Sequence, residues 1–215
     1  DTMEVLEATS DVTILSTTDL DNACTYPTPV NPTITIKNLG PNPVGPGSSI
    51  TKTIPLSIMV NGVVMVSEIF TPAIDIPLNG TADFTFTNSL TLLTPSTDSI
   101  RIYSKINEDP DKGNDTLKLV TNIWGMPDVN FPIDTIVTKQ ADTLHIDAGS
   151  GFTTYTWRNS SITTQIFDVT SVQSAWYSVT VTDAHSCGSD KDSVFVNAKD
   201  LSVLDIESPF NAFCS

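Results

Sequence analysis

The sequence predicts an all-β fold made of tandem antiparallel β-sandwiches that follow one another in an extended array. Apolar and polar residues alternate with a period of two in many short segments along the chain, which is the pattern of half-buried strands. Clusters of Pro, Gly and Asn separate these segments and are typical of turns. No segment carries the 3.6-residue periodicity of an amphipathic helix, so no helix is expected.

The first half of the chain contains enough of these segments for one complete sandwich. The turn signals between them include the Pro- and Gly-rich stretch NLGPNPVGPGSS at residues 38–49, whose residue types favour chain reversals. Short strands at this spacing predict two packed antiparallel sheets of the immunoglobulin-like (Ig-like) type. The expected strands are residues 11–17, 32–38, 53–61, 63–70, 81–87, 99–106 and 115–123.

A Pro-containing joint, WGMPDVNFP at residues 124–132, marks the boundary to a second and smaller Ig-like sandwich. This second set of strands spans about 70 residues, close to the lower limit for a core that supports itself. Trp157, Phe167 and Tyr177 are its expected core aromatics. The expected strands are residues 134–138, 143–147, 154–158, 164–169, 176–183 and 192–198.

The composition narrows the classes of function. Twenty-five acidic residues against 10 basic ones give a net charge of −15 and a pI near 4.1, which repels nucleic acid and anionic membranes. No run of 18 apolar residues is present, so direct membrane insertion is not expected, and any export signal would lie outside this piece. The abundance of Thr, Ser, Asn, Asp, Pro and Val is typical of an extracellular all-β protein.

The last residues of the chain resemble its first strand. DVTILSTTDLDNAC begins at Asp11, and DLSVLDIESPFNAFC begins at Asp200, a period of about 190 residues that is typical of a repeat array. The chain is therefore interpreted as one repeat with overhangs. Its expected parts are 1–10, the tail of a preceding Ig-like domain; 11–126, the large sandwich; 127–199, the small one; and 200–215, the first strand of the next large one.

Both domains resemble known modules. The first is similar to the CARDB-like adhesion module in its DVTI start, in VNPTITIKNLGPNPV, in the MVNG hairpin and in the late NDT. The second resembles Ig-like, PKD-related repeats of bacterial surface proteins through LHIDAGSGFTTYTWRNSS and YSVTVTDAHSCGSD. Alternation of such modules resembles the giant surface adhesins of Bacteroidetes-type bacteria, including those of gliding motility. The resemblance implies cell adhesion, a cell-surface location and export by type IX secretion.

The three cysteines are expected to form disulfide bonds that link neighbouring domains of the array. The first strand of domain 1 carries the chain toward domain 2, so the loop that contains Cys24 lies at the end facing domain 2. The hairpin before the last strand of domain 2 contains Cys187 and lies at the end facing domain 1. We therefore predict a Cys24–Cys187 disulfide, with Cys214 pairing to the next unit. Free buried thiols are the alternative, which an oxidising location disfavours.

Six Asp-Ser/Thr dipeptides, each followed by an aliphatic residue, resemble the O-glycosylation signal of Bacteroidetes-type exported proteins. The alternative interpretation is structural: Asp closes a turn, the hydroxyl faces water, and the aliphatic residue enters the core as a strand begins. Both interpretations are compatible, because a hydroxyl at a strand start is accessible. The candidate hydroxyls are Thr2, Ser99, Thr116, Thr135, Thr143 and Ser193.

The acidic loop NEDPDKGND at residues 107–115 is a candidate calcium site. Asp109, Asp111 and Asp115 would supply the oxygens that Ca²⁺ prefers, although the EF-hand pattern fails because Gly113 takes a ligand position and no bidentate Glu follows. The alternative is a turn in which Asx side chains cap the loop's own backbone. Calcium is the only cofactor that the sequence suggests.

The sequence shows no catalytic constellation, and we predict that the protein is not an enzyme. Neither His145 nor His185 stands in a nucleophile or metal motif, and His145 is expected to face solvent. The leading hypothesis is a non-catalytic repeat of a large secreted adhesin or filament, acting as a stiff spacer whose partners are neighbouring repeats. The alternative is a carbohydrate-binding module for surface polysaccharide or other cells. It would use Trp176, which should point outward because Tyr177 enters the core, as its sugar platform.

Overall fold

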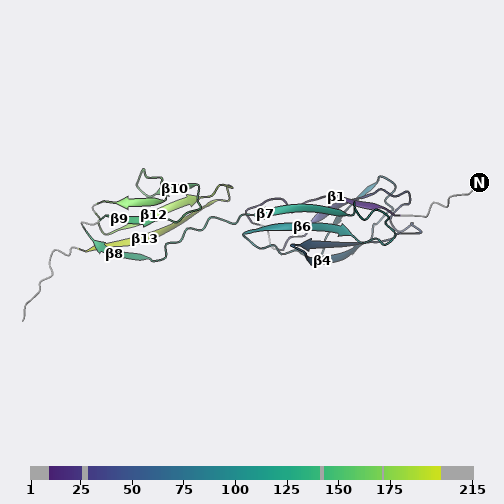
Figure 1. Ribbon diagram of the computed structural model, residues 1–215, viewed down its shortest axis with the longest axis horizontal. Coiled ribbons are helices and arrows are strands. Elements are labelled where there is room, and N and C mark those ends of the chain that lie inside the picture. The colour runs from purple at the N-terminus through teal and green to yellow at the C-terminus, as the bar shows by residue number, and fades with distance from the viewer. Residues whose placement is uncertain (1–9, 26–28, 141–142, 171, 200–215) are drawn as a thin grey trace, which may run out of the picture. The chain divides into compact units, whose positions relative to one another are not determined.

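The computed structural model describes residues 10–25, 29–140, 143–170 and 172–199. Every regular element within these ranges is a β-strand (Figure 1). No helix among these residues is long and apolar enough to cross a membrane. The chain divides into two compact units, unit 1 at Asp1–Gly125 and unit 2 at Met126–Ser215, and each is described by itself below.

Unit 1 is a sandwich of two antiparallel sheets. The alternation that predicts its strands is visible in burial: in β2 Thr33, Thr35 and Lys37 are partly exposed, whereas the residues between them and the last residue, Ile34, Ile36 and Asn38, are completely buried. Both sheets contribute to one core, with Val12 from the first sheet and Ile58 and Ile102 from the second. The first sheet has the order β1 (Val12–Thr17), β2 (Thr33–Asn38), β5 (Thr81–Thr85), and the second β4 (Val63–Phe70), β3 (Ile54–Val60), β6 (Ser96–Ser104), β7 (Thr116–Ile123).

A carboxylate joins the two sheets of unit 1 at one edge. Glu68 in β4 accepts hydrogen bonds from the backbone N–H groups of Thr87 (3.0 Å) and Asn88 (2.5 Å), which follow β5, and from the Thr87 hydroxyl (2.9 Å). Slight burial raises the pKa of Glu68, but these hydrogen bonds outweigh it and lower the pKa below its usual value. The hydrogen bonds of Glu68 therefore contribute fully to stability at pH values above the ordinary pKa of Glu. That contribution is lost as the pH falls through the lowered pKa of the folded state.

Unit 2 is a smaller sandwich with one feature that the sequence analysis missed. Its strands β8 and β13 pair in parallel, Phe195 opposite Thr135, which is one parallel edge within the antiparallel sandwich that the sequence predicts. The reason is that the first and last strands of the unit run in the same direction within one sheet. The sheets are β10 (Thr154–Trp157), β12 (Ala175–Thr182), β13 (Ser189–Lys199), β8 (Thr135–Lys139), and β11 (Ile166–Val169) with β9 (Leu144–Asp147).

Trp157 occupies the core of unit 2, as predicted. Its side chain is 2% exposed, and its ring lies 5.1 Å from that of Phe167 and 6.3 Å from that of Phe131. The indole N–H donates to the backbone oxygen of Thr164 at 2.9 Å, which satisfies the one polar atom of a buried tryptophan. Phe167 and Tyr177 are partly buried and pack against the same cluster, so the expected core aromatics are confirmed.

The Pro-containing stretch after unit 1 is part of unit 2's core and not a free joint. Val129 and Phe131 are 4% and 7% exposed. Their backbone N–H groups donate to the carboxylates of Asp190 (2.7 Å) and Asp192 (2.6 Å) on β13. Carboxylate oxygens thus accept the hydrogen bonds that backbone carbonyls of a neighbouring strand would accept in a sheet. The segment at residues 129–131 therefore packs against β13 although it is not a regular strand.

All thirteen expected strands are present, and their ends shift by a few residues. The largest shifts are the starts of β6 and β13, each of which begins three residues before the predicted start. In β6 the prediction placed Asp98 in a turn, whereas Asp98 is 5% exposed and accepts hydrogen bonds from Asn61 (2.7 Å) and Ser96 (2.8 Å). Most of the expected tail at 1–10 and all of 200–215 lie outside the described residues.

Candidate functional site

Cys24 and Cys187, the two cysteines among the described residues, are both disulfide-bonded. Cys24 follows β1, and its carbonyl accepts a hydrogen bond from Gly125 N–H at 2.8 Å. Cys187 lies between β12 and β13, is 5% exposed, and its N–H donates to Asp183 at 3.0 Å. The alternative of free buried thiols is therefore wrong for these two residues. Their pairing with each other stays a prediction, and Cys214 lies outside the described residues.

The loop at 107–115 brings two of its three candidate calcium ligands together. Asp109 and Asp115 are each 3% exposed and share a hydrogen bond between their carboxyl groups. Asp111 is exposed and caps its own loop, accepting from Gly113 N–H (3.0 Å) and from the Asn114 amide (3.2 Å). Within the described ranges no three acidic, His or Cys side chains are arranged to hold a metal ion. The geometry thus fits the self-capping turn, and calcium binding stays a prediction.

The buried carboxyl pair has a distinct electrostatic character. Burial, together with the neighbouring Asp109 carboxyl, raises the pKa of Asp115 to about 6, although the Ser104 hydroxyl and the Lys112 ammonium oppose the shift. One oxygen of Asp115 accepts from Ser104 at 3.0 Å, and Asp109 accepts from the Val12 backbone N–H at 3.0 Å. The pair therefore ties the start of β1 to the β6–β7 connection, and it does so best when one proton is shared.

The candidate glycosylation sites differ in accessibility. Thr135 and Thr143 are exposed at or just before the starts of β8 and β9, as the sequence predicts. Ser99 is exposed but lies inside β6, and Ser193 lies inside β13 and is half-buried, so the expected position at a strand start is wrong for both. Thr116 begins β7 and is also half-buried, and Thr2 lies outside the described residues.

The acid of the dipeptide is already engaged at three of the sites. Asp98 and Asp115 are buried, and Asp192 accepts hydrogen bonds from Phe131 N–H (2.6 Å) and Ser193 N–H (2.7 Å). By contrast, Asp134 is exposed beside Thr135. The carboxylates at Ser99, Thr116 and Ser193 therefore have structural roles that explain those dipeptides without any modification.

Trp176 is exposed, as its alternation with Tyr177 predicts. Its side chain is 61% exposed, and its ring lies 5.3 Å from that of Phe195, its cross-strand partner on β13, at an interplanar angle of 52°. Sequence analysis identified the tryptophan but missed Phe195. The signal that could have revealed it is the alternation in SVFVNAK, which places Phe195 on the face opposite to Val194 and Val196.

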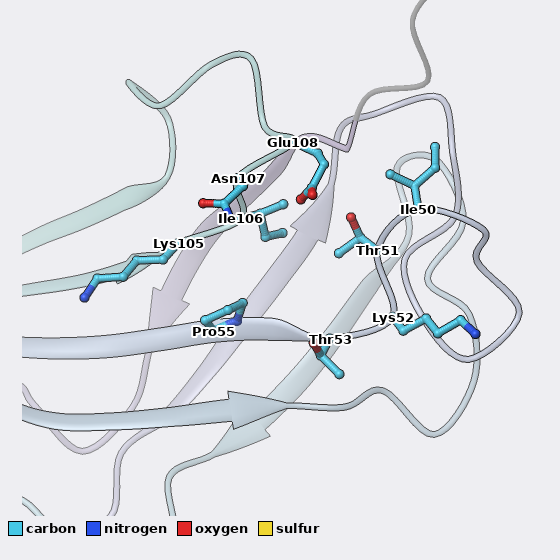
Figure 2. A pocket seen from close by; sticks show the side chains of 9 residues that line it. All are labelled: Ile50, Thr51, Lys52, Thr53, Pro55, Lys105, Ile106, Asn107 and Glu108. Atoms are coloured by element: carbon cyan, nitrogen blue, oxygen red, sulfur yellow. The ribbon is translucent and has the colours of Figure 1, made fainter.

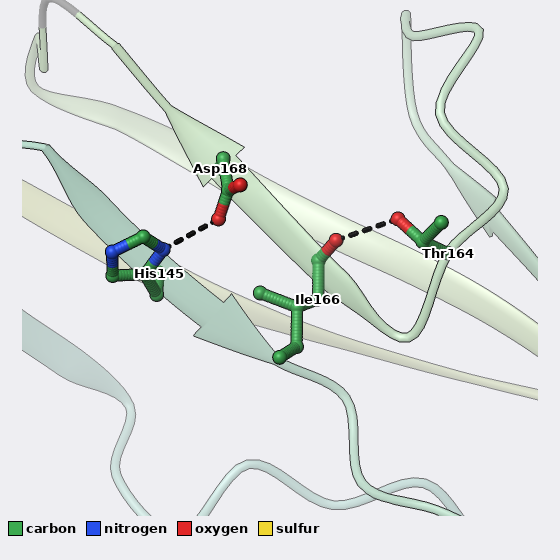
Figure 3. A network of polar contacts seen from close by, with 4 residues as sticks. All are labelled: His145, Thr164, Ile166 and Asp168. Atoms are coloured by element: carbon green, nitrogen blue, oxygen red, sulfur yellow. Dashed lines mark hydrogen bonds and ion pairs between the residues drawn. The ribbon is translucent and has the colours of Figure 1, made fainter.

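His145 and Asp168 form an exposed pair on neighbouring strands (Figure 3). The imidazole Nδ1 lies 2.5 Å from a carboxylate oxygen, and the two side chains are 67% and 59% exposed, so the prediction that His145 faces solvent is confirmed. The residues are directly opposite in the β9–β11 register. The pair is a cross-strand contact of the kind that stabilises sheets.

Unit 1 contains an open hollow of about 230 Å³ between the segment before β3 and the loop after β6 (Figure 2). Its lysine side chains, Lys52 and Lys105, extend in opposite directions (Figure 2), so they do not converge on a single ligand. The Lys105 ammonium lies 5.2 Å from the centre of the Tyr103 ring. Thr51 shares a hydrogen bond with Ser10 at 2.6 Å. The hollow therefore holds structural contacts and offers no nucleophile and base in contact.

Comparison with known proteins gives only distant likenesses. No protein-family model matches the chain, and no curated protein matches it. Among solved structures it is similar to a CARDB domain from Pyrococcus furiosus in complex with di-metal ions (13% identity, 55% of this chain and 96% of that one, TM-score 0.39). It is also similar to fibronectin(III)-like modules of Clostridium thermocellum CbhA (11%, 88% and 94%, TM-score 0.29) and to tandem Ig domains of titin (12%, 88% and 99%, TM-score 0.32). The fold assignment therefore rests on the strands and cores of this chain.

Proposed function

We propose that this chain is a non-catalytic repeat unit of a large secreted cell-surface adhesin or filament, acting as a stiff extracellular spacer. The observation that carries the proposal is that Cys24 and Cys187 are disulfide-bonded, because structural disulfides persist in oxidising locations outside the cytosol. Sandwiches in tandem suit a spacer, since each folds around its own core. The sequence resemblance supplies the wider context of cell adhesion, gliding motility and type IX secretion, with neighbouring repeats as partners.

A stiff spacer requires that bending between one domain and the next be limited, and the proposed Cys24–Cys187 bond would limit it. The chain between these residues forms a long loop, and closing such a loop removes about 5 kcal/mol of entropy from the unfolded chain in the chain-entropy model. A bond between the two domains would also limit bending, which is the property that a spacer requires.

Peptide mapping under non-reducing conditions tests the pairing. We expect one cross-linked peptide that contains both Cys24 and Cys187, and we expect reduction to broaden the distribution of molecular dimensions seen by small-angle scattering. The Cys24→Ser variant, which should leave one thiol at Cys187 that reacts with an alkylating reagent, is the matched control. Native protein in which both thiols react, or in which either is bonded to Cys214, contradicts the proposal.

O-glycosylation is proposed for the two accessible sites, Thr135 and Thr143. Both hydroxyl residues are exposed, whereas Thr116 and Ser193 are half-buried and Ser99 follows a buried acid. In protein purified from its natural host, we expect mass spectrometry to find glycopeptides at these two threonines and unmodified peptides at Thr116 and Ser193. Bare peptides at both threonines, or glycans confined to the half-buried sites, would contradict this assignment.

A second candidate function, carbohydrate binding by unit 2, is favoured by one observation. Trp176 is a large aromatic side chain that is 61% exposed beside a second aromatic ring, and exposed aromatic surface with polar groups around it is suited to ligand binding. Sugar rings can stack through their C–H groups on an indole face, and the polar rim of the ring tolerates water. This function is compatible with the spacer role, because the tryptophan lies away from the core of the unit.

A further inference from the structure

The outer face of the four-stranded sheet of unit 2 carries only basic charge. Strand alternation sends Tyr177 and Val194 into the core and leaves the intervening residues on the opposite face. On that face stand Lys139, Lys191 and Lys199, and none of its positions in β8, β10, β12 and β13 is Asp or Glu. This face is a local exception in a chain whose net charge is −15.

The acids of β13 do not neutralise this face. Asp190 and Asp192 alternate with the outward residues, and their carboxylates bind the backbone N–H groups of Val129 and Phe131 on the inner side of the strand. Arg158, which follows β10, is exposed, and its N–H donates to the Ser178 carbonyl on β12. The basic side chains of the outer face are therefore free to meet a ligand from solvent.

These basic residues also have no ion-pair partner among the described residues. In the part of the chain that the structure describes, none of Lys139, Arg158, Lys191 and Lys199 forms an ion pair. Lys139 and Lys199 are directly opposite each other in the β8–β13 register, an arrangement of like charges that destabilises a sheet. An external anion would relieve that repulsion.

Trp176 and Phe195 lie in the middle of this basic face. Arg158 lies beside Ser178, which is two residues after Trp176 on β12. Residues two apart on a strand are ~7 Å apart on the same face, so Arg158 lies about that far along the sheet from Trp176. Lys191 precedes Phe195 by four residues on β13, which is about 13 Å along the strand. Val137, 60% exposed, continues the apolar patch onto β8. Aromatic surface is thus bracketed by positive charge on both sides.

Hydroxyl groups fill the positions between these rings and charges. Ser178 faces Ser193 across β12 and β13, and Thr180 faces Lys191. The Ser178 residue is 6% exposed, and its hydroxyl oxygen makes no hydrogen bond with any described residue. A buried hydroxyl without a hydrogen-bond partner costs stability. A ligand that moves the side chains over Ser178 aside would provide the missing hydrogen bond.

We propose that this face binds a carboxylated polysaccharide, with sugar rings stacked on Trp176 and their carboxylates paired with Arg158 and Lys191. The proposal deepens the second candidate function and rests on it, but it is independent of the spacer role. A neutral sugar would use the aromatic surface and leave the charges unpaired. A nucleic acid would meet only a small number of basic residues within a strongly acidic molecule, where a phosphate chain needs many such contacts.

The experiment uses the full chain, produced without O-glycans so that Thr135 beside Phe195 is bare. Polygalacturonate is the ligand probe, and the same polymer with its carboxylates methyl-esterified is the uncharged comparison. Binding is measured by calorimetry and by protection of tryptophan fluorescence from acrylamide. Trp157 is buried and Trp124 is half-buried, so the part of this protection that Trp176→Ala removes is the part that reports on Trp176. We expect the acidic polymer to bind about tenfold more tightly than its ester, a factor reasonable for a few charge contacts.

Separate variants test the two parts of the site. Trp176→Ala should weaken binding of polygalacturonate about tenfold, as expected for loss of one stacking ring. Lys191→Glu should weaken it by a similar factor and abolish the preference over the ester. Lys191 is exposed, so this variant should fold even if Trp176→Ala does not. Val120→Ala and Lys118→Ala, at exposed positions of unit 1, are the matched controls and should bind like the unchanged protein.

The following results would contradict the proposal. Absence of binding, equal affinity for the ester, or binding that survives both unit 2 variants would exclude an acidic-glycan site on this face. Equal or tighter binding of poly-glutamate or oligothymidylate would reassign the face to an acidic polypeptide or a single-stranded nucleic acid. If peptide mapping finds the Cys24–Cys187 bond but the glycan does not bind, the spacer function remains supported and only the acidic-glycan site is rejected.

Discussion

Replacing Asp192 by Ala is expected to lower the free energy of unfolding of unit 2 by about 2–3 kcal/mol, the range for a hydrogen bond to a charged group whose partner is left buried. One carboxylate oxygen accepts from Phe131 N–H at 2.6 Å and the other from Ser193 N–H at 2.7 Å. Phe131 is 7% exposed and packs near Trp157. Without the carboxylate, the N–H of Phe131 loses its acceptor, and the ring loses the contact that holds it in the core.

Amide hydrogen exchange followed by mass spectrometry measures this effect locally. We expect faster exchange in the peptide that contains Val129 and Phe131, together with a lower midpoint of denaturant unfolding for unit 2. Asp192→Asn should lose part of the stability, because an amide offers one acceptor oxygen where the carboxylate offers two. Asp128→Ala removes an exposed acid of the same segment and is the control. If Asp128→Ala and Asp192→Ala lower stability equally, the carboxylate does not hold the segment.

Replacing Asp115 by Asn is expected to stabilise unit 1 at pH 7 by on the order of 1–2 kcal/mol. Burial raises the pKa of Asp115 to about 6, above its value in an unfolded chain. The contribution of this group to stability is therefore present at low pH and is lost as the pH rises through 6. Asn carries no charge at any pH, can accept from Ser104 and can donate to Asp109, so it imitates the protonated acid.

Denaturant unfolding of unit 1 between pH 4 and pH 7.5 tests this expectation. The difference in unfolding free energy between the Asn variant and the unchanged protein should be largest above pH 6 and should shrink toward pH 4, because both then hold a neutral group at this position. Taking the difference cancels other acids such as Glu68, whose lowered pKa acts in the opposite direction. Asp111→Asn, at an exposed position of the same loop, should show no such trend. A constant difference at all pH values would mean that Asp115 does not titrate near 6.

The candidate site was predictable in part from the sequence. Alternation correctly placed Trp176 outside and Tyr177 inside, because each strand residue faces the side opposite to its neighbours. The aromatic partner Phe195 was not identified, since its contact with Trp176 depends on the register between β12 and β13. The buried carboxyl pair was also missed, because NEDPDKGND shows acids in a loop and does not show which of them turn inward.

The sequence by itself determined that the chain is all-β, where its strands lie and that Trp157, Phe167 and Tyr177 belong to the second core, because a period of two and turn residues are local signals. Only the tertiary structure decided that β8 and β13 are parallel, that residues 129 and 131 belong to the core of unit 2, and that one sheet face is free of acids. These features arise where segments distant in the chain meet. Their register, on which every cross-strand contact depends, is set by packing of the whole unit.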